Sequence, residues 1–298
     1  MLDLNELLSG NTLVVLLATS LLGLSCGVIG TFAVLRGRSL IGDALAHASL
    51  PGICISYLIF QERSFLLLLS GALVFGLLSV LCIAFIKERT LIKEDAAIAV
   101  SLSSFFGLGI ALSRIVQNQP QGNRAGLDDF IFGKAASIVT QDMVFIAAVS
   151  GITLLIVALL TKEFKVLCFD REFAVTQGYP VKKLDLLLMT LIGLCVISGL
   201  PAVGVVLVSA LLIFPAVTAR LWSSKLELVL VMAGFFGALA AVLGTVLSAA
   251  VSGTMLGSVR GLPTGPVIVL SAAAIFLLSL LFAPQHGIVS RLLTRMRR

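Results

Sequence analysis

The sequence predicts an all-α polytopic membrane protein with about nine transmembrane helices. Of its 298 residues, 59% are apolar and only 12% are charged, and the mean hydropathy is +1.13. A soluble chain of this length cannot bury so much apolar surface. The apolar residues also form long unbroken runs, whereas a transmembrane barrel shows alternating segments of about ten residues. These observations exclude a water-soluble enzyme and a disulfide-stabilised secreted scaffold.

Nine segments approach the length of about 20 apolar residues that a spanning helix needs. In order, they are 12–35, 43–60, 65–86, 96–116, 138–161, 184–200, 202–221, 227–250 and 264–283. The second contains Asp43, His47 and Pro51, and the chain has eight spans if this segment is partly re-entrant. The turn at 199–202 predicts a tight hairpin between the sixth and seventh helices. No polar stretch is long enough for a separate domain, so residues 1–298 are expected to form one transmembrane domain.

The distribution of basic residues predicts the orientation of the chain in the membrane. With nine spans, sixteen of the 21 lysines and arginines lie on the side of the C-terminus. Cytoplasmic connections are the ones enriched in lysine and arginine. We therefore expect the N-terminus outside and the C-terminus in the cytoplasm. The net charge of +6 then reflects topology, and it gives no reason to expect a nucleic-acid partner.

An external polar loop is predicted at residues 117–137. It is long enough to meet an extracytoplasmic partner, and it contains Asp128 and Asp129. These two acids either attract a cation or cap the helix that follows. The sequence leaves both interpretations open.

A second polar segment, residues 164–185, is predicted on the cytoplasmic side. Asp170 suits a helix N-cap, and Glu172 falls in the first turn, where the helix dipole favours an acid. Gly178 suits the residue after the helix end, and Pro180 follows as a stop. The segment therefore predicts a short helix at about 171–177. It is either a lever that touches a cytoplasmic partner or an interfacial helix that rests on the membrane.

Ionisable groups concentrate in the 43–60 segment. A central Asp costs about 2.5–3.5 kcal/mol on insertion scales, so its presence needs a reason. Asp43 and His47 are at i and i+4 and share one helix face. Pro51 lacks an amide proton, which leaves the carbonyl of His47 without its helical partner. A carboxylate, an imidazole and a free carbonyl on one turn suit a divalent cation such as manganese, iron or zinc.

Other interpretations of this segment stay open. Asp43 and His47 can form a buried ion pair that only holds the helix, or Asp43 can be an N-cap at the membrane interface. Cys54 is a weaker candidate ligand, because it lies on the same face of the helix as Asp43 but about 10 Å beyond His47 along the helix axis. His286 follows the last span and is expected to be an exposed terminal group.

Two motifs for other chemistries are absent from the sequence: GxxxxGK[ST] for a P-loop and HExxH for a zinc protease. The serines near His47, Ser39 and Ser49, do not lie in the GxSxG context of a serine hydrolase. We therefore expect that the chain is not an enzyme.

The sequence resembles the membrane permease subunits of bacterial manganese/zinc/iron ABC importers, the metal-chelate type of ABC permease. Five stretches in the expected order carry the resemblance: RGRSLIGDALAHASLPG (36–52), LDDFIFGKAASIVTQD (127–142), FDREFAVTQGYPVKKLD (169–185), LPAVGVVLVSALLIFPAVTARL (200–221) and LPTGPVIVL (262–270). Relatives often carry an acid just before PTGP. Here Arg260-Gly261-Leu262 precedes it, which places an acidic role there in doubt.

The resemblance implies a permease in a bacterial inner membrane that passes Mn²⁺, Zn²⁺ or Fe²⁺ through the Asp43/His47 helix and binds no permanent cofactor. It implies a separate ABC ATPase, an extracytoplasmic metal-binding protein and a second permease subunit, identical or not. Residues 170–178, with Phe173 and Ala174, would then form the helix that couples to the ATPase. A permease for a siderophore or cobalamin, and an ion-coupled carrier that works without an ATPase, are the alternatives.

Overall fold

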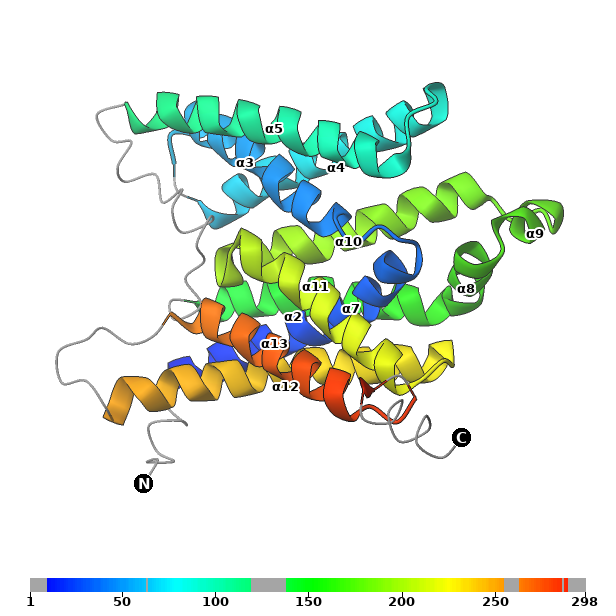
Figure 1. The fold of residues 1–298 in the computed structure, drawn as a ribbon. Coiled ribbons are helices and arrows are strands. Elements are labelled where there is room, and N and C mark those ends of the chain that lie inside the picture. Colours follow the sequence, from blue (N-terminus) through cyan, green and yellow to red (C-terminus); the bar gives the residue numbers. More distant parts are fainter. Residues whose placement is uncertain (1–9, 63, 119–137, 255–262, 286, 289–298) are drawn as a thin grey trace. The chain divides into compact units, whose positions relative to one another are not determined.

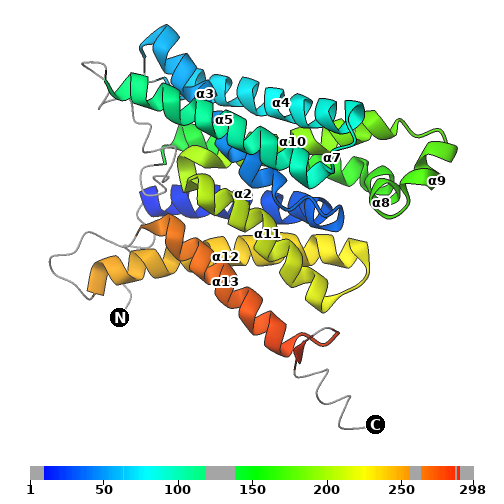
Figure 2. The ribbon, with the colours of Figure 1, turned by 45° about the horizontal axis from the view of Figure 1, so that its top comes forward.

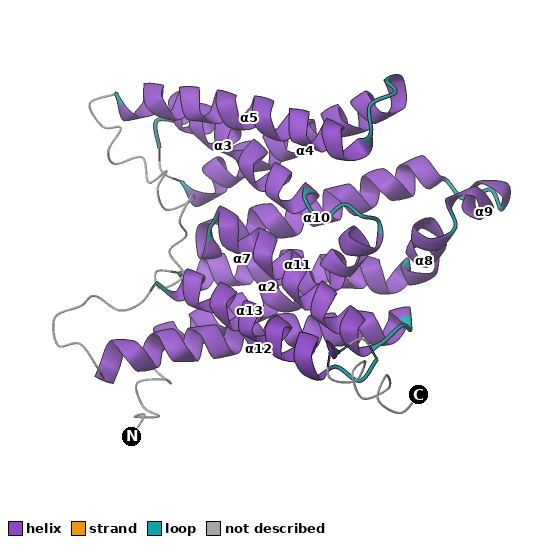
Figure 3. Ribbon diagram, in the orientation of Figure 1, coloured by secondary structure: helices purple, strands orange, loops and turns teal. Residues whose placement is uncertain are grey.

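A computed structural model describes residues 10–62, 64–118, 138–254, 263–285 and 287–288. Within these ranges the chain forms eleven helices and no strand (Figure 3). The long apolar ones are α2 (Gly10–Leu35), α3 (Ile41–Phe60), α4 (Phe65–Arg89), α5 (Glu94–Gln117), α7 (Thr140–Leu159), α10 (Val181–Val203), α11 (Val205–Trp222), α12 (Leu226–Thr254) and α13 (Thr264–Phe282). The all-α prediction is confirmed, and each predicted span has a helix.

Eight of these helices are long and apolar enough to cross a membrane. The ninth, α11, is the shortest, and its apolar stretch is Leu207–Trp222. Of the nine predicted spans, the 202–221 segment is therefore the one that falls short of a spanning helix. The 43–60 segment, which the sequence left in question, is among the eight helices that are long enough.

The predicted turn at 199–202 is wrong. Helix α10 continues through Pro201 and ends at Gly204, whose φ is +82°. A proline inside a membrane helix is tolerated where its surroundings satisfy the freed carbonyl. The chain breaks instead at the residue that adopts a positive φ without steric cost.

The described helices fall into two compact units, and one of the points at which the chain passes from one unit to the other lies within α11, between residues 209 and 210. The first unit holds α2, α7, α12, α13 and most of α11 (Figure 2). Its helices α2 and α12 approach closely, because a Cβ on Gly23 would lie 2.4 Å from the carbonyl oxygen of Gly237. Small residues permit such backbone contacts in lipid.

The second unit holds α3, α4, α5 and α10 together with two short helices, α8 (Thr161–Phe169) and α9 (Arg171–Thr176). Helix α3 packs against α4, α5 and α10 (Figure 1). A Cβ on Gly52 would lie 2.1 Å from the carbonyl oxygen of Gly71 on α4, so these two backbones touch. The helix that carries Asp43 and His47 is thus held on several sides within one unit.

Candidate functional site

Asp43 and His47 lie together on the first two turns of α3. The Asp43 Oδ1 to His47 Nε2 distance is 3.5 Å. Their side chains keep 37% and 25% of their exposure respectively, although most of the helix around them is buried. Leu40 is the N-cap of α3, so Asp43 is a residue of the first turn and the N-cap alternative is excluded.

Phe106 on α5 packs against the imidazole. The two ring centroids are 4.7 Å apart and the planes meet at 72°, an edge-to-face contact. The Nδ1 atom of His47 is buried and has no hydrogen-bond partner among the described residues. The imidazole ring therefore contacts both Phe106 and Asp43.

The spacing of this pair suits a shared cation. Two ligand atoms that each lie about 2.1 Å from a metal in tetrahedral geometry are about 3.4 Å apart. The observed 3.5 Å is close to this value. The described part of the chain nevertheless contains no group of three or more His, Cys, Asp or Glu side chains that could hold a metal. Among the described residues, Asp43 and His47 therefore offer two side-chain ligands, half of a four-ligand set.

The other predicted groups on α3 lie deeper. Pro51 is buried inside the helix, and α5 approaches it at Gly109. Cys54 is fully buried, with its Sγ 3.9 Å from the Gly109 carbonyl oxygen, and the structure does not bring it together with Asp43 and His47. Asp128, Asp129 and His286 lie outside the described residues.

The short helix predicted at about 171–177 is present as α9. The Phe173 amide donates to Asp170 Oδ1 at 2.8 Å, which confirms the N-cap. At the other end, Gly178 has a φ of +78° and its amide donates to the Val175 carbonyl, while the Tyr179 amide donates to the Ala174 carbonyl. These two bonds form a Schellman motif. Glu172 lies in the first turn, as expected, and Pro180 caps the start of α10.

Helix α8, which precedes α9, was not predicted. Its buried face consists of Phe164 and Leu167 at i and i+3, a signal too short to separate from a loop. On α9, Ala174 is buried, whereas Phe173 and Val175 are exposed by 49% and 60%. An exposed apolar surface on a six-residue helix is suited to contact with another surface.

A buried charge cluster near these helix ends was also not predicted. The Arg38 guanidinium donates to both carboxylate oxygens of Asp185, with its Nη2 3.0 Å from Oδ2, and its Nε pairs with Glu94. Lys87 Nζ lies 2.8 Å from Glu94 Oε2 and 3.7 Å from Asp185 Oδ2. Lys87 and Glu94 are seven residues apart, but Arg38 and Asp185 lie far from them and from each other in sequence, so no local pattern reveals the cluster.

The electrostatics of the cluster keep Arg38 charged. Burial alone lowers the pKa of Arg38, but its hydrogen bond and charge interaction with Asp185, followed by those with Glu94, raise it above its ordinary value. The guanidinium therefore stays charged at neutral pH.

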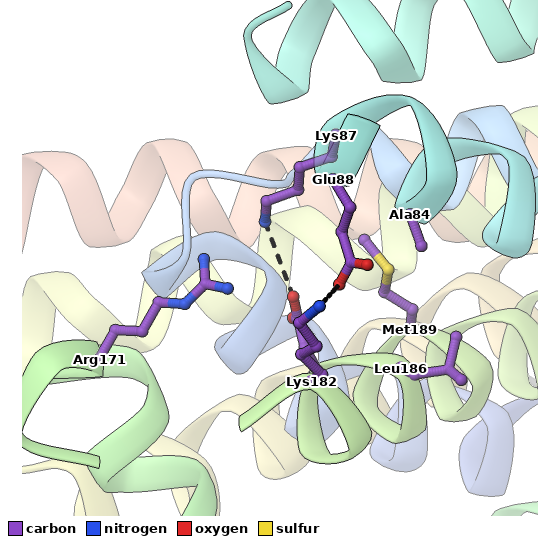
Figure 4. A pocket seen from close by; sticks show the side chains of 8 residues that line it. Ala84, Lys87, Glu88, Arg171, Lys182, Leu186 and Met189 are labelled. Carbon is purple, nitrogen blue, oxygen red and sulfur yellow. Dashed lines mark ion pairs between the residues drawn. The ribbon is translucent and has the colours of Figure 1, made fainter. Parts of the chain in front are cut away.

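A small pocket opens beside this cluster. Its lining comes from α4, α9 and α10: Ala84, Lys87, Glu88, Arg171, Lys182, Asp185, Leu186 and Met189. Figure 4 shows Arg171 directed toward the pocket from α9, and Lys182 paired with Glu88 across it at 3.0 Å.

Comparison with known proteins identifies the family. The model of the ABC 3 transport family matches residues 10–283. The manganese transport system membrane protein MntC of Bacillus subtilis is 44% identical over 287 residues, which are 96% of this chain and 64% of that relative, so the chain spans less than two thirds of its length. The zinc transport system membrane protein TroC of Treponema pallidum is 41% identical, over 95% of this chain and 92% of that one.

A solved structure agrees with these sequence matches. PsaBC from Streptococcus pneumoniae in complex with Fab superimposes with a TM-score of 0.81 at 32% identity, over 98% of both chains. The family match, the two relatives and this superposition each extend over nearly all of the chain. The chain therefore belongs to the ABC 3 transport family.

Proposed function

We propose that this chain is the transmembrane permease subunit of an ATP-driven importer of manganese or zinc ions, a multi-pass protein of a bacterial inner membrane. The observation that carries the proposal is the Asp43/His47 pair on α3, in a chain whose relatives are named for manganese and zinc transport. A permease for a large chelate needs no such pair on one turn. Fe²⁺, which the sequence resemblance also suggested, stays a prediction.

Asp43 and His47 act as the ligands of the ion in transit. Two chains, each with one carboxylate and one imidazole, would together provide four side-chain ligands. Asp43 supplies negative charge to a dehydrated dication, and His47 binds through an unprotonated nitrogen. The Pro51-freed carbonyl of His47 adds an oxygen ligand on the same turn.

The surface of α9 docks on an ABC ATPase, and the external side receives metal from an extracytoplasmic binding protein. Support for the docking comes from the firmly capped short helix with Phe173 and Val175 exposed. The chain itself has no P-loop, so hydrolysis belongs to the partner. In this arrangement α9 is cytoplasmic, the N-terminus is outside and the C-terminus is inside.

Metal uptake by the complex in proteoliposomes tests the function. We expect Asp43→Ala and His47→Ala each to lower uptake of Mn²⁺ or Zn²⁺ at least about tenfold, because each removes one ligand. Asp95→Ala is the matched control, since Asp95 is an exposed carboxylate at the start of α5 in the same unit. Uptake at the wild-type rate in both α3 variants would remove the site. Full uptake by the permease without any ATPase would instead support an ion-coupled carrier.

A further inference from the structure

The proposed function assigns no role to the buried charge cluster, yet its ion pairs connect residues at the ends of four helices. Arg38 lies three residues before Ile41, the first residue of α3, Lys87 is in the last turn of α4, and Glu94 is the first residue of α5. Asp185 is near the start of α10. Each of these four helices is therefore attached to the others by a charged group at the same end of the second unit.

The contact between Arg38 and Asp185 is a rigid one. Arg38 is only 2% exposed and Asp185 8%, so water does not compete for their hydrogen bonds. Two parallel bonds between a guanidinium and a carboxylate fix relative orientation as well as distance. Arg38 lies five residues before Asp43, and its carbonyl accepts the Ile41 amide at the start of α3. A displacement of Asp185 therefore reaches the turn that carries Asp43.

Helix α9 is linked to Asp185 in two ways. Along the chain, the Schellman motif at Gly178 leads within three residues into α10. Across space, Arg171, the first residue of α9, lines the same pocket as Lys87 and Asp185, and Figure 4 shows its guanidinium directed toward that pocket. A displacement of α9 would therefore act first on the start of α10 and on the charge cluster.

We infer that Arg38 and Asp185 are positioning residues, which transmit movement of α9 and α10 to the Asp43/His47 turn of α3. Lys87 and Glu94 neutralise the remaining charges and tie α4 and α5 to the same point. This role rests on the proposed function. In this role the cluster couples ATP hydrolysis to ion passage and does not bind the ion.

The test measures metal ions transported per ATP hydrolysed by the complete reconstituted transporter. Arg38→Lys keeps the charge but loses the bidentate contact. We expect the ratio to fall at least threefold, with ATPase activity and equilibrium metal binding unchanged. Lys182→Ala is the matched control, because it removes an exposed ion pair on α4 and α10 that lines the same pocket. It should leave the ratio at the wild-type value.

Two further variants separate positioning from folding. The exchange Arg38→Asp with Asp185→Arg should recover part of the ratio, whereas either single change should not. If Arg38→Lys fails to assemble, Asp185→Glu alters the same contact with charge retained. A wild-type ratio in the variants that assemble, or a ratio that falls only in proportion to the folded fraction, overturns the inference. Absence of metal transport by the wild-type complex would overturn the proposed function itself.

Discussion

Two glycines of α5 provide a test of how tightly α5 packs against α3, the helix that carries Asp43 and His47. A Cβ added at Gly109 would lie 2.9 Å from Leu50 Cβ and 3.0 Å from Pro51 Cδ, both on α3. A Cβ added at Gly107, half a turn away on the same helix, would meet nothing within 4 Å. Gly109→Ala must therefore push α5 away from the proline turn of α3, whereas Gly107→Ala meets no atom of the described chain.

The magnitude follows from the comparison. Both variants gain the same helix propensity, up to about 1 kcal/mol, so this gain cancels between them. What remains is overpacking at Gly109, which costs about 1–3 kcal/mol in a close-packed interior. With a shift of about 2–4 °C per kcal/mol, Gly109→Ala should melt roughly 2–12 °C below Gly107→Ala.

The assay is thermal unfolding of the purified permease in detergent, with both variants heated at one rate because membrane proteins often unfold irreversibly. Metal uptake should follow the same order, because α5 also carries Phe106 against His47. Equal melting temperatures for the two variants would show that α5 does not pack on α3 at Pro51 as described.

Two predictions concern α9. Asp170→Ala removes the N-cap and should cost the helix about 1 kcal/mol, seen as faster hydrogen exchange at the Phe173 amide; unchanged exchange would contradict the cap. Gly178→Val places a β-branched residue at a φ of +78° and should distort the end of α9, which weakens co-purification with the ATPase. Gly151→Val, at a helical glycine with open space around it, is its control, and equal ATPase recovery from both variants would argue against docking through α9.

Features within one helix could be predicted from the sequence, because they depend on composition and spacing alone. The nine apolar runs matched nine helices, and the i, i+4 spacing placed Asp43 beside His47. The two ends of α9, at Asp170 and Gly178, could also be predicted, because helix capping depends on residues within one turn of the helix end. Local stereochemistry was therefore sufficient to predict most of the helices.

Features that depend on contacts between helices could not be predicted. Arg38 and Asp185 are 147 residues apart, and each alone resembles an ordinary loop charge near a span end. Phe106 is one of 18 phenylalanines, and no spacing marks it as the ring that packs on His47. The break at Gly204 was misplaced because Pro201 is the stronger signal in soluble helices, whereas a membrane bundle accommodates it.

The proposed division of the ion ligands between two chains leads to a last prediction. A carrier must bind its ion and then release it, so a complete ligand set on one rigid helix would hold the ion too firmly. Asp43 and His47 supply only part of a set, and their 37% and 25% exposure leaves room for further ligands. Affinity then depends on how two permease chains are placed, which is what an ATPase can change.

The prediction is a stoichiometry. The assembled dimer should bind one Mn²⁺ or Zn²⁺ per two chains at this site, and Asp43→Ala should abolish that binding without dissociating the dimer. A monomer separated in detergent should bind at least tenfold more weakly, because it has lost half of the ligands. Calorimetric titration of both forms measures this directly. One tightly bound ion per monomer, removed by Asp43→Ala, would mean that each chain holds a full site, and the ligands would then have to include residues beyond Asp43 and His47.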